Sequence, residues 1–168
     1  MIVPMQITHV SQIAALEAAT FSLPWDETSI QAELENPLAL WLVAEGETGE
    51  GEAKPVLGYV GSQTSFEDAD ILNVAVVPAA RRRGIAAALM TELETRLASR
   101  GVEQITLEVR ASNVAAIALY EQIGYAQVGL RKNYYEKPRE DALILQKRIA
   151  ARETEEDGFF DSAALRSE

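Results

Sequence analysis

An arginine-rich turn followed by an alanine-rich helix is the first feature of this chain that could do chemistry. Arg81, Arg82 and Arg83 stand before Gly84, and apolar residues typical of a buried strand run from Ile71 to Val77 just upstream. Glycine lets the main chain approach a ligand closely. The first N–H groups of a helix have no partner within the helix, and they lie at the positive end of its dipole. Such a turn predicts a site for an anion such as phosphate, although a solvated basic turn would have the same composition.

The spacing of the glycines excludes two common phosphate-binding motifs. This turn has one glycine, whereas a P-loop requires Gly-x-x-x-x-Gly-Lys and a dinucleotide-binding turn requires Gly-x-Gly-x-x-Gly. What remains is Arg81-x-x-Gly84-x-Ala86. This motif resembles the acetyl-CoA signature of the GNAT acetyltransferase superfamily, which is Arg or Gln, two residues, Gly, one residue, then Gly or Ala. The resemblance implies that the anion is the pyrophosphate of acetyl-CoA, which is the expected co-substrate.

The segment from Leu107 to Tyr125 carries a more specific motif. It begins Leu-Glu-Val-Arg-Ala-Ser-Asn, continues after a spacer with Ala-Ile-Ala-Leu-Tyr, and ends in Gly-Tyr. This pattern resembles the RimI-type ribosomal-protein-alanine N-acetyltransferases within the GNAT superfamily. Phe21 to Trp25, and Arg131 to Tyr135 with Glu140-Asp141-Ala142, are similar to further motifs of that family. The resemblance covers residues 2 to 149.

Glu108 is the expected general base. Acetyl transfer from a thioester to an amine needs a neutral amine, a stabilised oxyanion and a proton for the departing thiolate. Strand alternation places Glu108 on a polar face with Thr106 and Arg110, so the pattern alone also fits a surface residue paired with Arg110. The resemblance implies that Glu108 is the proton acceptor. An α-amino group has a pKa of about 7.7 to 8.0, against about 10.4 for lysine, so a peptide N-terminus is the easier acceptor near neutral pH.

Tyr120 is the expected general acid. At helical spacing it shares a stripe with Ala116, Ile117 and Ile123, so the pattern also fits a core aromatic residue. A phenol has an ordinary pKa of about 10 and stays protonated at neutral pH, which suits donation to a thiolate. The resemblance implies that role.

The resemblance also implies which residues contact acetyl-CoA. Main-chain groups of Val74, Ala75 and Val76 would hold the pantetheine arm, and an irregularity in that strand would free an N–H group to bind the oxyanion. Asn113 would contact CoA, or would serve only as a helix cap. The pyrophosphate would lie against the turn and the start of its helix: Arg82, Arg83, Gly84, Ile85, Ala86 and Ala87.

Four aromatic residues are expected to form the walls of the acceptor channel: Phe21, Trp25, Tyr134 and Tyr135. The alternative is that these rings form a small satellite core. Glu140 and Asp141 add negative charge that could hold the ammonium group or basic side chains of a peptide.

The composition excludes several other kinds of site. The chain has no cysteine and a single histidine, His9, which argues against thiolate or multi-histidine metal sites and against a Ser-His-Asp triad. We therefore expect no metal, and we place His9 at the surface or in a cap. The net charge is −11, from 26 acidic and 15 basic residues, so a basic protein partner is favoured over nucleic acid. No apolar run is long enough for a membrane span or signal peptide, which predicts a cytoplasmic protein without a membrane partner, and we expect a monomer.

Apolar periodicity predicts eleven elements in the order β-α-α-β-β-β-α-β-α-β-β. The expected strands cover 2–6, 40–45, 56–63, 71–77, 104–110, 126–131 and 142–148, and the expected helices cover 10–20, 28–34, 85–99 and 113–123. In the first helix, Glu17 is expected on the side opposite the apolar residues. Residues 46–55 are glycine-rich and acidic, which is typical of a mobile solvated loop.

The fold class is therefore α/β. The long helix between two strands implies a crossover and a central parallel pair, and the resemblance implies the GNAT (acyl-CoA N-acyltransferase) fold, with a mixed, mostly antiparallel sheet and helices on both faces. We expect one acetyltransferase domain over 1–149. Residues 150–168 carry six acidic and two basic side chains, and we expect them to be a disordered or loosely docked tail.

Three functional hypotheses follow. The first is an acetyl-CoA-dependent N-terminal acetyltransferase whose acceptor is the N-terminal alanine of small-subunit ribosomal protein eighteen. The second is a GNAT enzyme that acetylates a lysine side chain, a small amine or other protein N-termini, since the fold is reused with different acceptor walls. The third is a non-catalytic module that keeps the CoA site.

Overall fold

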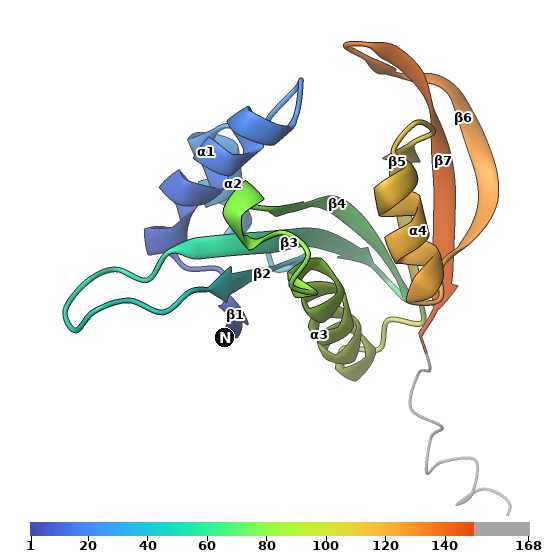
Figure 1. Ribbon diagram of the computed structural model, residues 1–168. Helices are drawn as coiled ribbons and strands as arrows, with labels where there is room; N and C mark the ends of the chain where they lie inside the picture. The colour runs from blue at the N-terminus through green and yellow to red at the C-terminus, as the bar shows by residue number, and fades with distance from the viewer. Residues whose placement is uncertain (150–168) are drawn as a thin grey trace, which may run out of the picture.

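Seven strands form a single mixed sheet in the order β1-β2-β3-β4-β5-β7-β6, with helices on both faces (Figure 1). The structure is a computed structural model, and it describes residues 1 to 149. The strands are β1 (Ile2–Pro4), β2 (Ala39–Glu45), β3 (Val56–Ser65), β4 (Asp68–Val76), β5 (Gln104–Arg110), β6 (Ala126–Glu136) and β7 (Arg139–Arg148). The helices are α1 (Val10–Thr20), α2 (Glu27–Glu33), α3 (Ile85–Ser99) and α4 (Val114–Gln122), with short 3-10 turns η1 (Ile7–His9) and η2 (Pro78–Ala80).

The sheet is antiparallel except between β4 and β5. Helix α3 makes the crossover between these two parallel strands, as parallel strands require. The expected fold class is confirmed: a mixed, mostly antiparallel sheet with a central parallel pair. The expected order of all eleven strands and α-helices is confirmed as well.

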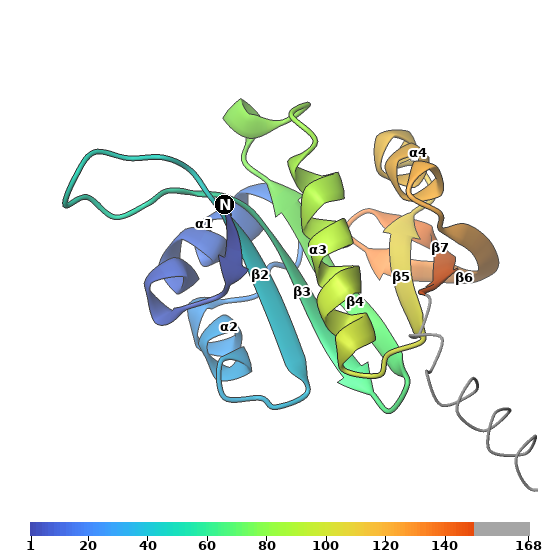
Figure 2. The ribbon, with the colours of Figure 1, turned by 90° about the horizontal axis from the view of Figure 1, so that it is seen from below.

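Side-chain alternation along β2 creates two cores, one on each face of the sheet. Leu40, Leu42 and Ala44 point into the core that α3 and α4 cover. Trp41 and Val43 point the other way, into the core beneath α1 and α2. Figure 1 shows α1 and α2 above the sheet and α3 below it, and Figure 2 shows α3 lying along β2, β3 and β4. The period of two along one strand thus supplies apolar contacts to both helical layers.

The central parallel pair opens towards one edge of the sheet. β4 and β5 pair only over Asp68–Asp70 with Gln104–Thr106, and beyond these residues the strands diverge (Figure 1). The pairing of β3 with β4 also shifts, because Gly61 pairs with Asn73 while Ser62 pairs with Ile71. Leu72 is therefore an extra, bulged residue. The expected irregularity thus lies in β4, two residues before Val74, and the main-chain groups of β4 beyond Asp70 are not paired with β5.

Several expected boundaries differ from the observed ones: β1 ends two residues earlier than expected, β4 starts three residues earlier, and the largest differences are in the hairpin of the last two strands. Helices α1 and α3 and strand β5 have the expected limits, whereas β6 and β7 continue to Glu136 and start at Arg139. Residues 132–139 of this hairpin tip are exposed apart from Tyr135. The tip projects beyond the sheet without a buried face, so it lacks the apolar alternation from which strands are predicted.

Two acidic or basic side chains are more buried than expected. His9, expected at the surface or in a cap, is 3% exposed, so of these two positions the structure shows the cap. Its Nδ1 accepts the Gln6 N–H at 2.9 Å, and its Nε2 lies 3.1 Å from Glu45. Glu17 is 0% exposed, so its expected position away from the core was wrong. Its carboxyl group is buried because three hydrogen-bond donors surround it.

Three further expectations concern the rest of the chain. Residues 47–55, between β2 and β3, are exposed throughout. None of the helices within residues 1–149 is long and apolar enough to cross a membrane. The tail expected over 150–168 lies outside the described residues.

Candidate active site

Two cavities meet in the gap between the diverging strands β4 and β5. The larger has a volume of about 900 Å³ and is lined by the α1–α2 loop, β4, β5 and the β6–β7 tip. The smaller, about 480 Å³, lies between the end of β4, the arginine turn and α4. Val74, Ala116 and Tyr120 line both. A molecule that spans both cavities therefore passes these three residues.

The smaller cavity collects most of the residues predicted to hold acetyl-CoA. Its lining includes Val74, Ala75, Val76, Arg82, Gly84, Ile85, Ala86 and Ala87, together with Arg81, Ala115, Leu119 and Tyr120. Small side chains on α3 and α4 leave the space open. Arg83 is not part of this lining, and its guanidinium instead donates to the Ala79 carbonyl at 3.3 Å.

The arginine turn has a main-chain conformation suited to an anion. Arg82 and Gly84 both have positive φ, at 64° and 73°. Gly84 is the N-cap of α3, and no side chain caps this helix, so its first N–H groups are free for a ligand. Alternation of left-handed residues turns successive N–H groups to one side, which is the geometry of an anion-binding nest. Arg81 supports the turn by donating from Nε to the Val76 carbonyl at 3.2 Å.

Glu108 lies on β5 in the lining of the larger cavity. Its expected facing is confirmed, because Leu107 and Val109 are buried on the opposite side. The suggested pair with Arg110 is absent from the ion pairs of residues 1–149. Glu108 Oε1 instead lies 3.6 Å from Arg131 Nε, and the Arg131 side chain is 56% exposed. A half-solvated partner of this kind leaves the carboxylate accessible from the cavity.

Tyr120 lies near the C-terminal end of α4 and is 9% exposed. Its ring packs edge to face against Tyr125, with the centroids 5.9 Å apart. Burial raises the pKa of Tyr120 to about 12. The phenol is therefore protonated throughout the neutral range and can donate a hydrogen bond into either cavity.

Asn113 is the N-cap of α4, and its Oδ1 accepts the Ala116 N–H at 3.2 Å. It lines the larger cavity and not the smaller one. The capping role is thus present in the structure, and a contact with CoA stays a prediction.

Three of the four predicted wall aromatics line the larger cavity: Phe21, Tyr134 and Tyr135. Trp25 does not. Its ring packs edge-on against Trp41, with centroids 5.5 Å apart, in the core beneath α1. For Trp25 the satellite-core alternative applies, because an aromatic residue after a turn can close a core as readily as a channel.

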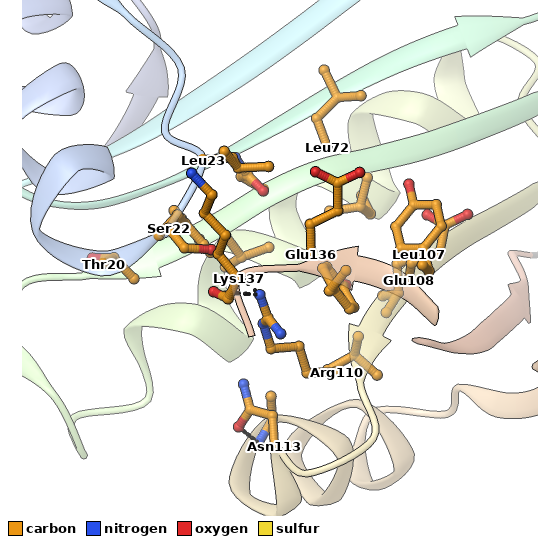
Figure 3. Close-up of a pocket in the computed structure, with 18 of the residues that line it drawn as sticks. Thr20, Ser22, Leu23, Leu72, Leu107, Glu108, Arg110, Asn113, Glu136 and Lys137 are labelled. Atoms are coloured by element: carbon orange, nitrogen blue, oxygen red, sulfur yellow. Dashed lines mark hydrogen bonds between the residues drawn. The ribbon is translucent and has the colours of Figure 1, made fainter. Parts of the chain in front are cut away.

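Arg110 connects opposite walls of the larger cavity. Its guanidinium donates to the carbonyls of Pro138 at 2.9 Å and Lys137 at 3.3 Å, and it contacts the Ser22 hydroxyl at 3.4 Å. The guanidinium also lies over the Tyr135 ring, with Cζ 4.3 Å from the ring centroid. Figure 3 shows Arg110 below Lys137 of the hairpin tip, on the side towards Asn113. One side chain from β5 therefore ties together segments that are far apart in sequence.

Charged residues at the hairpin tip were missed by the sequence analysis. Glu136, Lys137 and Pro138 line the larger cavity, and Figure 3 shows Glu136 turned towards Leu72 on β4. The carboxylates that were considered have partners within the protein: Glu140 accepts from Ser112 at 2.8 Å and lies 3.9 Å from the Arg110 guanidinium, and Asp141 accepts the Asn133 N–H at 2.8 Å. Glu136 directly follows the predicted wall residues Tyr134 and Tyr135 in the sequence, and this position could have indicated that it lines the same cavity.

The sequence matches the acetyltransferase (GNAT) family over residues 10–125, which include the arginine turn, Glu108 and Tyr120. The chain belongs to this family.

Among residues 1–149, no histidine and carboxylate side chains cluster in a way that could hold a metal ion.

Individual relatives resemble this GNAT chain over most of their length. The [ribosomal protein bS18]-alanine N-acetyltransferase of Escherichia coli K12 is 33% identical over 144 residues, covering 84% of this chain and 92% of that protein. The enzyme of the same name from Salmonella typhimurium is 36% identical over 133 residues, covering 77% and 84%. The crystal structure of the Escherichia coli ribosomal-protein-alanine N-acetyltransferase superposes with a TM-score of 0.77, at 32% identity, covering 92% of this chain and 97% of that one. The chain is an acetyltransferase of this family.

Proposed function

We propose that this chain transfers the acetyl group of acetyl-CoA to the N-terminal α-amine of a protein, and that its acceptor is the N-terminal alanine of ribosomal protein bS18. The observation that carries the proposal is the junction of the two cavities at Val74 and Tyr120, with Glu108 on the acceptor side. The names of the relatives support the choice of acceptor. The cytoplasmic location expected from the sequence remains part of the proposal.

In this proposal the donor occupies the smaller cavity. The N-terminal N–H groups of α3 and the guanidinium of Arg82 bind the pyrophosphate of acetyl-CoA. The pantetheine arm follows the main chain of β4 from Val76 to Val74. The thioester then lies beside Tyr120, where a β4 N–H group beyond the end of the β4–β5 pairing binds the carbonyl oxygen.

The acceptor amine enters through the larger cavity. Glu108 takes one proton from the α-amine, and the nitrogen attacks the thioester carbon, so that an N–C bond forms and a tetrahedral oxyanion develops. The C–S bond then breaks and the electron pair leaves with sulfur. Tyr120 supplies a proton to that sulfur and is reprotonated through the cavity, so the products are the acetylated amine and the free thiol of CoA.

The acidity of Tyr120 defines how it helps the departing thiolate. An ordinary thiol has a pKa of about 8.5, well below the value of about 12 for Tyr120. In water the proton would therefore stay on the phenol. The thiol of CoA would lie in the same buried environment. Burial disfavours the thiolate as it disfavours the phenolate, so the pKa of the thiol is raised as well. We infer that Tyr120 first stabilises sulfur by hydrogen bonding and gives up its proton as the C–S bond breaks.

Release of thiol from acetyl-CoA tests the proposal. Three acceptors are compared: a peptide starting with the N-terminal sequence of bS18, the same peptide with a blocked N-terminus and an internal lysine, and no peptide. We expect rapid release only with the free alanine terminus, and a decrease in kcat of about 10²- to 10⁴-fold in Glu108→Gln. The matched control is Glu121→Gln, an exposed carboxylate on α4, which should retain wild-type kcat. A preference for the lysine peptide would contradict the proposed acceptor, and no peptide-dependent release would favour a CoA-binding module.

A further inference from the structure

A carboxyl group that plays no part in the proposed chemistry lies at the centre of the α1 core. Glu17 is 0% exposed. No lysine, arginine or histidine within residues 1–149 forms an ion pair with it. A buried carboxylate without a cation is unfavourable unless hydrogen-bond donors replace its water. The partners of Glu17 therefore indicate why this residue is tolerated.

Three donors from three different elements meet the two carboxyl oxygens. Oε1 accepts from the Tyr59 hydroxyl on β3 and from Asn73 Nδ2 on β4, the latter at 2.7 Å. Oε2 accepts the main-chain N–H of Trp25, in the α1–α2 loop, at 3.1 Å. Burial and the adjacent carboxyl group raise the pKa of Tyr59, so its hydroxyl remains protonated and donates. Every bond to Glu17 thus uses it as an acceptor.

One of these partners lines the larger cavity, which is the proposed acceptor cavity, and a second belongs to a loop that forms part of its wall. Asn73 itself lines the larger cavity, next to the bulged Leu72. Trp25 does not line it, but it lies in the α1–α2 loop, residues 21–26, of which Phe21, Ser22 and Leu23 do line it. The Trp25 ring is also held, edge-on against Trp41. The loop is therefore anchored at Trp25 through both its amide and its ring.

We infer that Glu17 is a positioning residue that holds the α1–α2 loop against the bulged strand β4 and thereby sets the width of the acceptor cavity. This inference rests on the proposed function, because the loop matters only if an acceptor binds there. The donor cavity contains neither Asn73 nor any residue of the loop. Loss of the Glu17 carboxyl group should therefore weaken acceptor binding and leave acetyl-CoA binding unchanged.

Two variants at this position separate the role of the carboxyl group from that of its volume. Glu17→Met keeps a similar volume and removes every acceptor atom, whereas Glu17→Gln keeps one carbonyl oxygen that can accept the Trp25 N–H. We expect the KM for the acceptor peptide to rise about tenfold in Glu17→Met and about threefold in Glu17→Gln. The KM for acetyl-CoA should stay within about twofold of the wild type in both variants.

Tyr59→Phe is the matched control. It removes one of the three hydrogen bonds to Glu17, but Tyr59 lines neither cavity. We expect a lower Tm and an acceptor KM close to that of the wild type. If Glu17→Met fails to fold, the acceptor KM values of Glu17→Gln and Tyr59→Phe are compared instead. The inference would be overturned if Tyr59→Phe and Glu17→Gln had equal Tm values and raised the acceptor KM by the same factor. Glu17 would then only stabilise the fold.

Amide hydrogen exchange of residues 20–26 tests the same idea without any substrate. We expect exchange about tenfold faster in Glu17→Met, an intermediate rate in Glu17→Gln, and unchanged exchange in α3. Unchanged exchange of 20–26 in either variant that folds, or faster exchange with an unaltered acceptor KM, would overturn the inference. Absence of turnover on the bS18 peptide in the wild type would instead overturn the proposed function.

Discussion

The ring of Tyr120 packs edge to face against the ring of Tyr125, and the Tyr125 hydroxyl is bound to Glu94 at 3.2 Å. Glu94 also pairs with Lys147 on β7 at 2.8 Å. Tyr120 is therefore oriented by contacts to its ring, it lines both cavities, and its hydroxyl takes no part in the side-chain hydrogen bonds of residues 1–149. This arrangement separates the part of the side chain that packs from the part that is proposed to act.

Tyr120→Phe should keep the fold and lose activity. The ring contact to Tyr125 does not need the hydroxyl, so Tm should change little. Loss of the proposed proton donor should lower kcat by about 10²- to 10⁴-fold at saturating substrates. Thiol release and thermal unfolding measure the two effects.

The control for this variant is Tyr125→Phe. It removes the hydrogen bond to Glu94 and should lower stability by about 1 kcal/mol while kcat stays near that of the wild type. Wild-type turnover in Tyr120→Phe would remove this residue from the mechanism.

The pH dependence of kcat should show no contribution from Tyr120 in the ordinary range. Burial raises the pKa of this phenol to about 12, so the neutral donor form predominates below that pH and is lost only as the pH rises through it. Profiles of wild type and Tyr120→Phe, measured from about pH 6 to about pH 10, should therefore be parallel. An alkaline decrease in the wild type that is absent from Tyr120→Phe would show that the phenol ionises much earlier.

Sequence patterns predicted best the parts of the molecule that have one buried face. Strand β5 buries every second residue and helix α3 buries residues at helical spacing, and the limits of both were predicted to the residue. The sheet order was not predictable, because β7 lies between β5 and β6 through contacts that local periodicity does not encode. The splay of β4 from β5, on which the whole site depends, likewise arises from pairing and not from composition.

Site residues were predicted correctly where a sequence motif determines the main-chain conformation. They were misplaced where contacts with distant parts of the chain determine the position of the side chain. Gly84 and its helix follow from the turn sequence itself. Trp25 and Glu17 were misplaced because one packs on Trp41 and the other is surrounded by donors from two strands and a loop. Arg110 was considered only as a partner of Glu108, since nothing in the sequence places it beside the hairpin tip.

Gly84→Ala should weaken acetyl-CoA binding through the main chain. Gly84 has φ of +73° and no atom within 4 Å of an added Cβ, so the cost is conformational, about 1–2 kcal/mol. The turn should relax away from the left-handed conformation and raise the KM for acetyl-CoA several-fold. Gly84→Asn should cost less, because asparagine tolerates this conformation. Equal KM values for acetyl-CoA in wild type and Gly84→Ala would contradict a role for the turn geometry.

Arg110→Lys should affect the acceptor and not the donor. Lysine keeps the charge but lacks the planar fork that reaches the carbonyls of Pro138 and Lys137 and the hydroxyl of Ser22. We expect the acceptor KM to rise about five- to tenfold with the acetyl-CoA KM unchanged. Steady-state kinetics with each substrate varied in turn gives both values. A change confined to acetyl-CoA would contradict the assignment of Arg110 to the acceptor cavity.

The most direct measurement of the central claim is an internal competition. A single peptide with the N-terminal sequence of bS18 carries both a free alanine α-amine and an internal lysine, and tandem mass spectrometry locates the first acetyl group added. The proposed site predicts acetylation of the alanine α-amine, with the lysine unmodified at early times, and no modification in Glu108→Gln. Acetylation of the lysine ahead of the α-amine would contradict the claim.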